Sequence, residues 1–203
     1  MEKSKIKESF CLSDSQTEKI EFYLLSVIKQ NQHINLIGKS TIKNIWERHV
    51  LDCLQLTKYI NNKNHKILDL GTGAGLPGVL LSLVGYKNII MVDSIKKKTD
   101  FVQKMISELS LSAKVFNQRI EKLKTPPQDI IVSRALAPLE KLLSYSLIHS
   151  NKNTTSLFLK GRNVNIEIEK AMKKYSFELC KTKSLSSGDG CILNIKNIKT
   201  KND

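Results

Sequence analysis

The spacing of hydrophobic residues changes at Lys66. Before that point, apolar residues recur every three or four positions, first from Ile20 to Ile28 after the cap-like Ser13, and again from Ile42 to Cys53. This period is that of an amphipathic helix, whose apolar face packs against the rest of the protein. The pattern therefore predicts an N-terminal helical extension over residues 1–62, with two such helices.

After Lys66, short apolar runs alternate with helical patterns. The strand-like runs are KILDL, NIIMVD, AKVFNQ, DIIVSRA and SLFLKG, and the helical patterns lie near residues 78–84, 97–110, 138–150 and 163–174. Alternation of this kind predicts a mostly parallel sheet with helices on its faces. The last two strands, SFELCKTKSL and CILNIKNI, are separated only by the turn-rich SSGDG, which favours an antiparallel hairpin.

This order of elements is that of an α/β, Rossmann-like core of the Class I methyltransferase type, here spanning residues 63–199. The mostly parallel sheet, the C-terminal antiparallel hairpin and the helices ahead of the first strand favour it. We expect one main domain, because 203 residues can build one full core but not two large ones. Residues 200–203, the end of the run IKTKND, are expected to fray.

A glycine-rich loop follows the first strand-like run, in KILDLGTGAGLPGVLLSLVG. A strand, then closely spaced glycines, then a helix is the arrangement in which backbone approaches a nucleotide. Counted from the strand, the run is Asp69-x-Gly71-x-Gly73-x-Gly75, and Leu76 stands where a dinucleotide-binding pattern has its third glycine. Asp69, expected in the turn, disfavours a pyrophosphate but favours the ammonium and sulfonium of S-adenosylmethionine, directly or through water. A tight turn that needs glycine only for packing is the alternative.

Asp93 ends the run NIIMVD about twenty residues after the glycine loop. A carboxylate at this place can accept hydrogen bonds from both ribose hydroxyls of a bound nucleoside. It can also cap the next helix, a task that Ser94 performs as well. Together, Asp69, Gly71 and Asp93 favour S-adenosylmethionine as the cofactor over a nicotinamide dinucleotide.

The charge of the chain indicates a polyanionic partner. Thirty-three Lys and Arg residues against nineteen Asp and Glu give a net charge of +14, which favours nucleic acid or an anionic surface. Only four of the basic residues are arginines, so a lysine-rich surface without such a partner is the alternative. The four cysteines form no C-x-x-C pair, and no apolar segment follows the basic MEKSKIKESF, so we expect a cytoplasmic protein without membrane segments.

Seven segments of the chain resemble a known bacterial family: NLIG, WERHVLDCLQL, ILDLGTGAGLPGV, VDSIKKKTDF, QRIEKL, SRALAPL and LFLKGR. They run from about Asn35 to Gly161 and are similar to the glucose-inhibited division protein B family. Members of that family are methyltransferases that modify N7 of a guanine in small-subunit (16S) ribosomal RNA. The resemblance implies S-adenosyl-L-methionine as cofactor and small-subunit ribosomal RNA, or the small ribosomal subunit, as partner. We expect a monomer that does not bind membranes.

The resemblance also implies a set of cofactor contacts. The family places them on the first loop glycine and the residue after the third, on the acid–serine pair ending the second strand, on the pair before the third helix, and on the arginine after the fourth strand. In this sequence the implied contacts are Gly71, Leu76, Asp93, Ser94, Ile95, Ile120, Glu121 and Arg134, to which the loop itself adds Asp69 and Gly73. Cys53 and Ile37 depart from the family, which commonly has a serine and a threonine there.

No acid–base pair or nucleophile stands out in the sequence. Methylation of an exocyclic amine typically uses an Asn/Asp-Pro-Pro-aromatic motif after the fourth strand, where this chain has SRAL, and methylation of a pyrimidine carbon needs a Pro-Cys pair that is missing. Guanine N7 needs neither, because its in-plane lone pair can attack a methyl group directly. We therefore expect catalysis by proximity and alignment. Arg134 is the one candidate catalytic residue, at the end of a buried strand where open parallel sheets bind ligands.

Further basic residues are candidates for RNA contacts. They are Arg48 and His49 in the second helical stripe, Lys96 and Lys97 after the second strand, and Lys160 and Arg162 after the fifth. His49 is as well explained as a hydrogen-bonded core residue, and the lysines as solvated helix ends. No histidine or cysteine spacing indicates a metal site. Two competing functions stay open on the residues alone: a nicotinamide-dependent oxidoreductase, and a non-catalytic basic RNA-binding protein whose cofactor pocket is vestigial.

Overall fold

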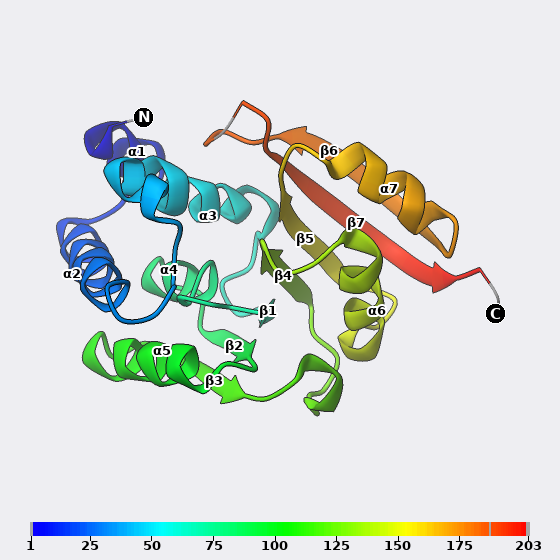
Figure 1. The fold of residues 1–203 in the computed structure, drawn as a ribbon, viewed down its shortest axis with the longest axis horizontal. Coiled ribbons are helices and arrows are strands. Elements are labelled where there is room, and N and C mark those ends of the chain that lie inside the picture. The colour runs from blue at the N-terminus through cyan, green and yellow to red at the C-terminus, as the bar shows by residue number, and fades with distance from the viewer. Residues whose placement is uncertain (1, 187, 202–203) are drawn as a thin grey trace.

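The computed structural model describes residues 2–186 and 188–201, and a sheet with helices on both faces forms its centre (Figure 1). The seven strands of this sheet lie in the order β3-β2-β1-β4-β5-β7-β6. They are β1 (Lys66–Leu70), β2 (Asn88–Asp93), β3 (Ala113–Asn117), β4 (Ile130–Arg134), β5 (Thr155–Lys160), β6 (Tyr175–Lys183) and β7 (Cys191–Thr200). Strands β1 to β5 are parallel, and β7 is antiparallel to β5 and β6. The predicted sheet and its closing hairpin are confirmed.

Successive side chains of the central strands point to opposite faces, and helices cover each face. In β1, Ile67 packs into the core beneath α2 to α5, and the next residue, Leu68, packs into the core beneath α6. The first face carries α4 (Gly78–Leu83), α5 (Lys96–Glu108) and the N-terminal extension, and the second carries α6 (Leu139–His149) and α7 (Val164–Met172). Burial of both faces explains why these strands are runs of Ile, Leu and Val.

The N-terminal extension has a more irregular backbone than its hydrophobic pattern predicts. The helix α1 (Lys3–Ser9) precedes α2 (Asp14–Gln30), which begins with a capping box between Ser13 and Gln16. The second stripe is not one regular helix as expected. It is divided into the 3-10 helix η1 (Lys39–Asn44), the π-helix η2 (Trp46–Leu51), the short α3 (Asp52–Leu54) and the 3-10 helix η3 (Gln55–Tyr59). Hydrophobic spacing indicates which side of a segment is buried, but not whether its hydrogen bonds are of the 3-10, α or π type. The π-helical turn here occurs where residues 48–52 contact Arg134 of β4.

The C-terminal strand is longer than expected. Strand β7 continues to Thr200, which pairs with Tyr175, and the backbone N–H of Lys201 donates to the Lys174 carbonyl oxygen at 2.9 Å. These pairs satisfy backbone groups that would otherwise need water. The prediction of a frayed tail is therefore wrong for Thr200 and Lys201, and its last two positions lie outside the described residues. Over the part of the chain that the structure describes, no helix is long and apolar enough to cross a membrane.

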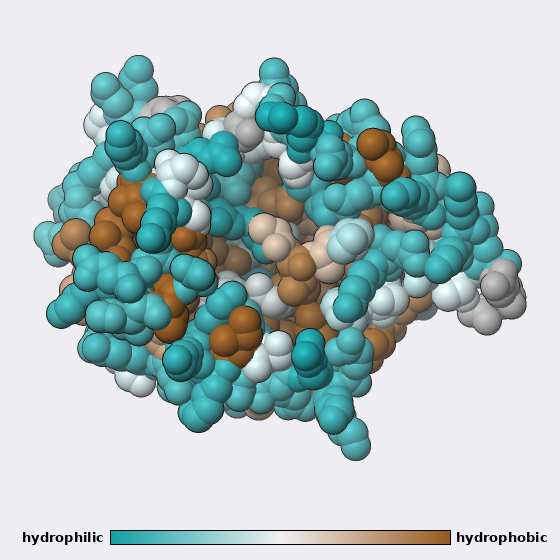
Figure 2. Space-filling model, viewed as in Figure 1, coloured by the Kyte–Doolittle hydropathy of each residue, from teal (hydrophilic) through white to brown (hydrophobic). Residues whose placement is uncertain are grey.

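The parallel strands all end at one edge of the sheet, and this edge holds the residues of interest. The loops after β1, β2, β4 and β5 meet there, next to the segment from η1 to η3. Figure 2 shows that the same view of the molecule is hollowed near its centre, with hydrophobic side chains inside a hydrophilic rim. Ligand sites of open parallel sheets lie at such an edge.

Candidate functional site

Asp69 holds the loop between β1 and α4 from within the sheet. It lies inside β1 rather than in the turn where the sequence placed it, and none of its surface is exposed. Its Oδ2 accepts hydrogen bonds from Thr72 Oγ1 at 2.6 Å and from the backbone N–H of Gly78 at 3.0 Å. Burial raises the pKa of Asp69 to about 7, although both hydrogen bonds act to lower it. Asp69 therefore organises the loop, and its Oδ1 is buried without a hydrogen-bond partner among the described residues.

Gly71 and Gly73 both have left-handed backbones, with φ of +65° and +59°. They differ in what lies beside them. A Cβ on Gly71 would lie 2.3 Å from Cδ1 of Leu136, so this side chain, from the loop after β4, covers the glycine. A Cβ on Gly73 would meet nothing closer than the Gly71 carbonyl oxygen, at 3.9 Å. The loop is thus open to a ligand at Gly73, whereas a ligand that reaches Gly71 must displace Leu136.

Asp93 contacts the glycine loop directly. At the end of β2, its Oδ2 accepts a hydrogen bond from the Gly73 N–H at 3.0 Å, and its Oδ1 accepts one from the Ile95 N–H at 2.9 Å. Each carboxylate oxygen has a second lone pair, so Asp93 can accept from ribose hydroxyls while it keeps both contacts. Ser94 and Ile95 are exposed beside it. The structure therefore brings the second-strand candidates to the open part of the loop.

The other cofactor candidates offer backbone groups more than side chains. Leu76 and Ile120 are 5% and 7% exposed and pack in the core, so only their backbones can meet a ligand. Glu121, in the 3-10 turn η4 (Ile120–Lys122), is exposed and accepts a hydrogen bond from Tyr145 Oη at 3.1 Å. A hydrogen bond from its own backbone N–H, and to a smaller extent Tyr145, lowers the Glu121 pKa. The lowered pKa makes Glu121 an ionised acceptor at neutral pH.

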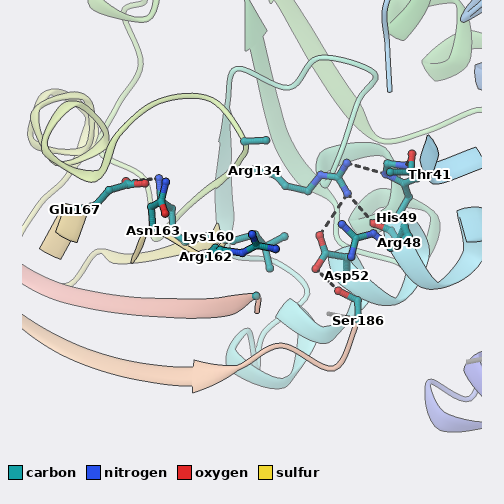
Figure 3. Close-up of a pocket in the computed structure, with 14 residues that line it drawn as sticks. Thr41, Arg48, His49, Asp52, Arg134, Lys160, Arg162, Asn163, Glu167 and Ser186 are labelled. Atoms are coloured by element: carbon teal, nitrogen blue, oxygen red, sulfur yellow. Dashed lines mark hydrogen bonds and ion pairs between the residues drawn. The ribbon is translucent and has the colours of Figure 1, made fainter. Parts of the chain in front are cut away.

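The guanidinium of Arg134, at the end of β4, is held by the N-terminal extension (Figure 3). Its Nη2 lies 2.7 Å from Nδ1 of His49. Its Nη1 donates to the Arg48 carbonyl oxygen at 3.2 Å and lies 3.4 Å from Oδ2 of Asp52. The N-terminal extension is thus part of the site, because it holds the guanidinium of Arg134 in place.

His49 is neutral and accepts a hydrogen bond from this guanidinium. It is 2% exposed, and burial, together with Arg134 and Arg48, lowers its pKa to about 3. Because arginine can only donate, Nδ1 is the acceptor and Nε2 carries the proton. Nε2 then donates to Thr41 Oγ1 at 2.7 Å, and Thr41 donates to the Gly38 carbonyl oxygen at 2.6 Å. Of the two interpretations, an RNA contact or a hydrogen-bonded core residue, the structure favours the core residue for His49.

Asp52 connects the C-terminal hairpin to the same site. Its Oδ1 accepts hydrogen bonds from Ser186 Oγ at 2.6 Å and from Gln55 Nε2 at 3.0 Å. Neither Asp52 nor Ser186 was a sequence candidate. Asp52 could have been found from the sequence, since it follows His49 by about one helical turn and so lies on the same side of the helix. No local pattern points to Ser186, because it lies 134 residues further along the chain than Asp52.

A cavity of about 380 Å³ lies along the C-terminal ends of β4 and β5. Arg134 lies between its two walls (Figure 3). One wall is formed by Arg48, His49 and Asp52 with Ser186, and the other by the segment from Lys160 to Asn163 with Glu167 of α7. The structure therefore gathers Arg48, His49, Arg134, Lys160 and Arg162, which the sequence had only suggested separately, around one cavity.

The remaining candidates do not line this cavity. Lys96 and Lys97 are exposed at the start of α5, close to Asp93 in the chain, and Lys96 pairs with Asp100 at 2.8 Å. Within the described ranges, no group of three or more His, Cys, Asp or Glu side chains is placed to hold a metal ion.

The loop side of the site fits S-adenosylmethionine. The space at Gly73 is open, and Asp93 presents carboxylate oxygens next to it. Ionised Glu121 and the guanidinium of Arg134 supply charges of both signs for a zwitterionic ligand. A nucleoside with a charged amino-acid tail is therefore compatible with the residues present.

The sequence matches the family described as GidB, rRNA small subunit methyltransferase G, over residues 16–195. A ribosomal RNA small subunit methyltransferase G from Rickettsia prowazekii (strain Madrid E) is 36% identical over 181 residues, which cover 89% of this chain and 94% of the relative. The protein of the same description from Orientia tsutsugamushi (strain Ikeda) is 39% identical over 176 residues, which cover 87% of each chain.

Solved structures share the fold at much lower identity. The PH0226 protein from Pyrococcus horikoshii OT3 superposes with a TM-score of 0.62 at 14% identity, covering 83% of this chain and 96% of that one. The ribosomal protein L11 methylase from Lactobacillus delbrueckii subsp. bulgaricus gives a TM-score of 0.60 at 18% identity, with 72% and 76% covered. These likenesses confirm the predicted Class I methyltransferase fold. Since the family match spans most of the chain, the protein belongs to the GidB family, the S-adenosylmethionine-dependent small-subunit ribosomal RNA methyltransferases G.

Proposed function

We propose that this protein methylates N7 of a guanine in 16S ribosomal RNA, with the base in the cavity beside Arg134. The observation that carries the choice of N7 is that the polar groups around Arg134 are committed to one another. His49 accepts from Arg134 and donates to Thr41, and its low pKa makes it a poor base. Asp52 accepts from Ser186 and Gln55. Guanine N7 needs no base, because its lone pair is free to attack.

The cofactor is proposed to lie over the open part of the glycine loop. Bound there, S-adenosylmethionine supplies an electrophilic methyl group. Asp93 would accept hydrogen bonds from its ribose hydroxyls. Backbone groups of Gly71, Gly73, Leu76, Ser94, Ile95, Ile120 and Glu121 are the remaining proposed contacts. Asp69 would act on the cofactor only through the loop, because its carboxylate is buried and bonded to Thr72 and Gly78.

Arg134 is proposed to orient the bound cofactor at the boundary of the two sites. A guanidinium has five N–H groups, and the contacts with His49, Arg48 and Asp52 leave some of them for a ligand. A carboxylate is the natural partner of such a fixed cation, and the cofactor has one. Alignment of the methyl group with N7 would then depend on a side chain that cannot move freely.

The RNA is proposed to bind around the cavity through its phosphates. Arg48 and Arg162 are exposed at the cavity rim, and Lys96 and Lys97 are exposed at the start of α5. His49 is buried and the Lys160 side chain is only 9% exposed, so both serve the cavity rather than the rim. We propose that one copy of the chain binds the ribosomal RNA in the cytoplasm, since a net charge of +14 favours a single polyanionic partner over self-association.

The N7 assignment is tested by the chemistry of its product. Methylation at N7 places a positive charge on the imidazole ring, which makes the ring reducible and weakens the glycosidic bond. Small-subunit RNA or particles incubated with the protein and S-adenosylmethionine should therefore gain one site, at a guanine, that borohydride and aniline cleave. Transfer of labelled methyl without a new cleavage site would exclude N7. A protein that binds RNA but gives no heat with S-adenosylmethionine in calorimetry would instead have a vestigial pocket.

A further inference from the structure

We propose that Lys160 and Glu167 read the Watson–Crick edge of the target base and restrict the reaction to guanine. The inference rests on the proposed function, because it names the groups that select the base in the same cavity. Both residues line the wall of the cavity opposite the N-terminal extension.

The two side chains form a fixed pair with unused hydrogen-bonding capacity. Lys160, the last residue of β5, has its Nζ 2.5 Å from Oε2 of Glu167, and the side chains are only 9% and 23% exposed. Nζ also donates to the Ala137 carbonyl oxygen at 2.9 Å, and Oε2 also accepts from the Leu139 N–H at 2.7 Å. An ammonium has three donors, so one remains for a ligand. The bonds that Glu167 accepts from described residues end on Oε2, which leaves Oε1 as an acceptor.

The pair therefore presents a donor beside an acceptor, in a fixed order. Guanine presents the complementary order, with the acceptor O6 beside the donors N1–H and N2–H₂. Adenine presents the reverse, because its N6–H₂ is a donor and its N1 an acceptor. Lysine cannot accept and a carboxylate cannot donate, so adenine would leave both partners unsatisfied, and their side chains are only 9% and 23% exposed. A site built on such pairs discriminates strongly against a base that lacks them.

This arrangement is also compatible with attack by N7. The Watson–Crick edge is distinct from the edge that carries N7, so a base held by Lys160 and Glu167 keeps its N7 lone pair free. Single-stranded or unstacked RNA bases are those that proteins read on the Watson–Crick edge. Arg134 lies between Lys160 and Glu167 on one side and the N-terminal extension on the other (Figure 3).

A structural role for the same pair makes a different prediction. Because Lys160 contacts Ala137 and Glu167 contacts Leu139, the pair also fixes the loop after β4. If that were its whole role, losing it would impair cofactor binding and folding without changing which base is preferred. The substitution Glu167→Gln separates the two, since a glutamine oxygen can still accept from the Leu139 N–H while its amide group replaces Oε1 with a donor.

The test measures binding of three RNAs to the protein saturated with S-adenosylhomocysteine. They carry guanine, inosine or adenine at the position that the borohydride and aniline cleavage identifies. Oε1 of Glu167 has two lone pairs and can accept from both N1–H and N2–H₂ of guanine, whereas inosine lacks N2–H₂, so the wild-type protein should bind the guanine RNA about tenfold more tightly than the inosine RNA. Glu167→Gln should lose this preference and weaken guanine binding by about tenfold or more. Glu169→Gln, the same charge change at an exposed position of α7, should behave as wild type.

Lys160→Met gives a second, independent reading, because it removes the donor for O6. It should weaken binding of guanine and inosine equally, as both bases carry O6. An unchanged guanine-to-inosine ratio in Glu167→Gln, with a normal wild-type cleavage site, would overturn this inference alone. A wild-type protein that produces no cleavage site at a guanine would overturn the proposed function and this inference together.

Discussion

Nη2 of Arg134 lies 2.7 Å from Nδ1 of His49, across 85 positions of the chain. The contact requires a neutral imidazole, because a protonated one has no acceptor. Since the His49 pKa is lowered to about 3, the acceptor is available at any physiological pH. The N-terminal extension therefore holds Arg134 in place at the edge of the sheet where the parallel strands end.

Removal of this support should impair methyl transfer more than folding. His49→Ala takes away the acceptor that orients Arg134, and a hydrogen bond to a charged group contributes about 1.5–3 kcal/mol. We expect kcat/KM for small-subunit RNA to fall by about ten- to a hundredfold, with a far-ultraviolet circular dichroism spectrum like that of wild type. His33→Ala, at an exposed position, is the control. Equal activity of both variants would show that His49 does not position Arg134.

The stability of the protein should depend on pH through two buried groups with opposite signs. Asp69 has a pKa of about 7 in the folded protein against an ordinary 3.8, so the stability it contributes is lost as pH rises between these values. His49 has a pKa of about 3 against 6.5, so its contribution is lost as pH falls through that range. Each changes the free energy of unfolding by up to about 1.4 kcal/mol per pH unit, and from about pH 4 to 6.5 they offset each other.

Variants should separate the two contributions in urea unfolding at about pH 4.5, 5.5 and 6.5, which lie in the range where both Asp69 and His49 change the free energy of unfolding. Asp69→Asn removes the first, and its amide oxygen can still accept from Thr72 and Gly78, so relative to wild type its free energy of unfolding should rise with pH. His49→Ala should show the opposite slope. Parallel curves for all three proteins would mean that neither group titrates abnormally.

The sequence predicts the sheet well because its evidence is local. Ile67 and Leu68 alternate between two cores, and this is visible as a continuous apolar run bounded by glycine. The glycine loop and Asp93 are also recoverable, since the spacing of a strand, a turn and the next strand brings them together.

What the sequence could not predict depends on distant contacts. Leu136 covers Gly71, and Ser186 donates to Asp52, without any local pattern that connects either pair. The π-helical segment around His49 reads as an ordinary amphipathic stripe, because hydrophobic spacing does not record which carbonyl accepts each N–H. The pairing of Glu167 with Lys160 also requires the fold, since either residue alone resembles a solvated charge.

Asp93 should contribute to cofactor affinity through its carboxylate. Asp93→Ala would leave ribose hydroxyls without acceptors and release the Gly73 N–H, so we expect the Kd of S-adenosylhomocysteine to rise by about ten- to a hundredfold in calorimetry. Ser94→Ala changes a neighbouring exposed side chain and should have little effect. Loss of RNA affinity with cofactor affinity unchanged would place Asp93 outside the cofactor site.

Gly71 has two possible reasons to be glycine, and a double-mutant cycle distinguishes them. A Cβ there would lie 2.3 Å from Leu136 Cδ1, so Gly71→Ala should destabilise the protein, with about 1–2 kcal/mol added by its φ of +65°. Leu136→Ala removes the clash, so part of the lost stability should return in the double variant. Gly85→Ala reports the cost of a positive φ alone, because Gly85 has a φ of +98° and a Cβ there would have no atom within 4 Å.

Cofactor affinity gives the decisive half of the cycle. If Gly71 exists only to accommodate Leu136, the double variant should bind S-adenosylhomocysteine as well as Leu136→Ala does. If the cofactor displaces Leu136 and lies against Gly71, the added methyl group still blocks it, and affinity should stay about tenfold or more below that of Leu136→Ala. We expect the second result, because the neighbouring Gly73 is open and bonded to Asp93, so a nucleoside held by that carboxylate lies over the same turn.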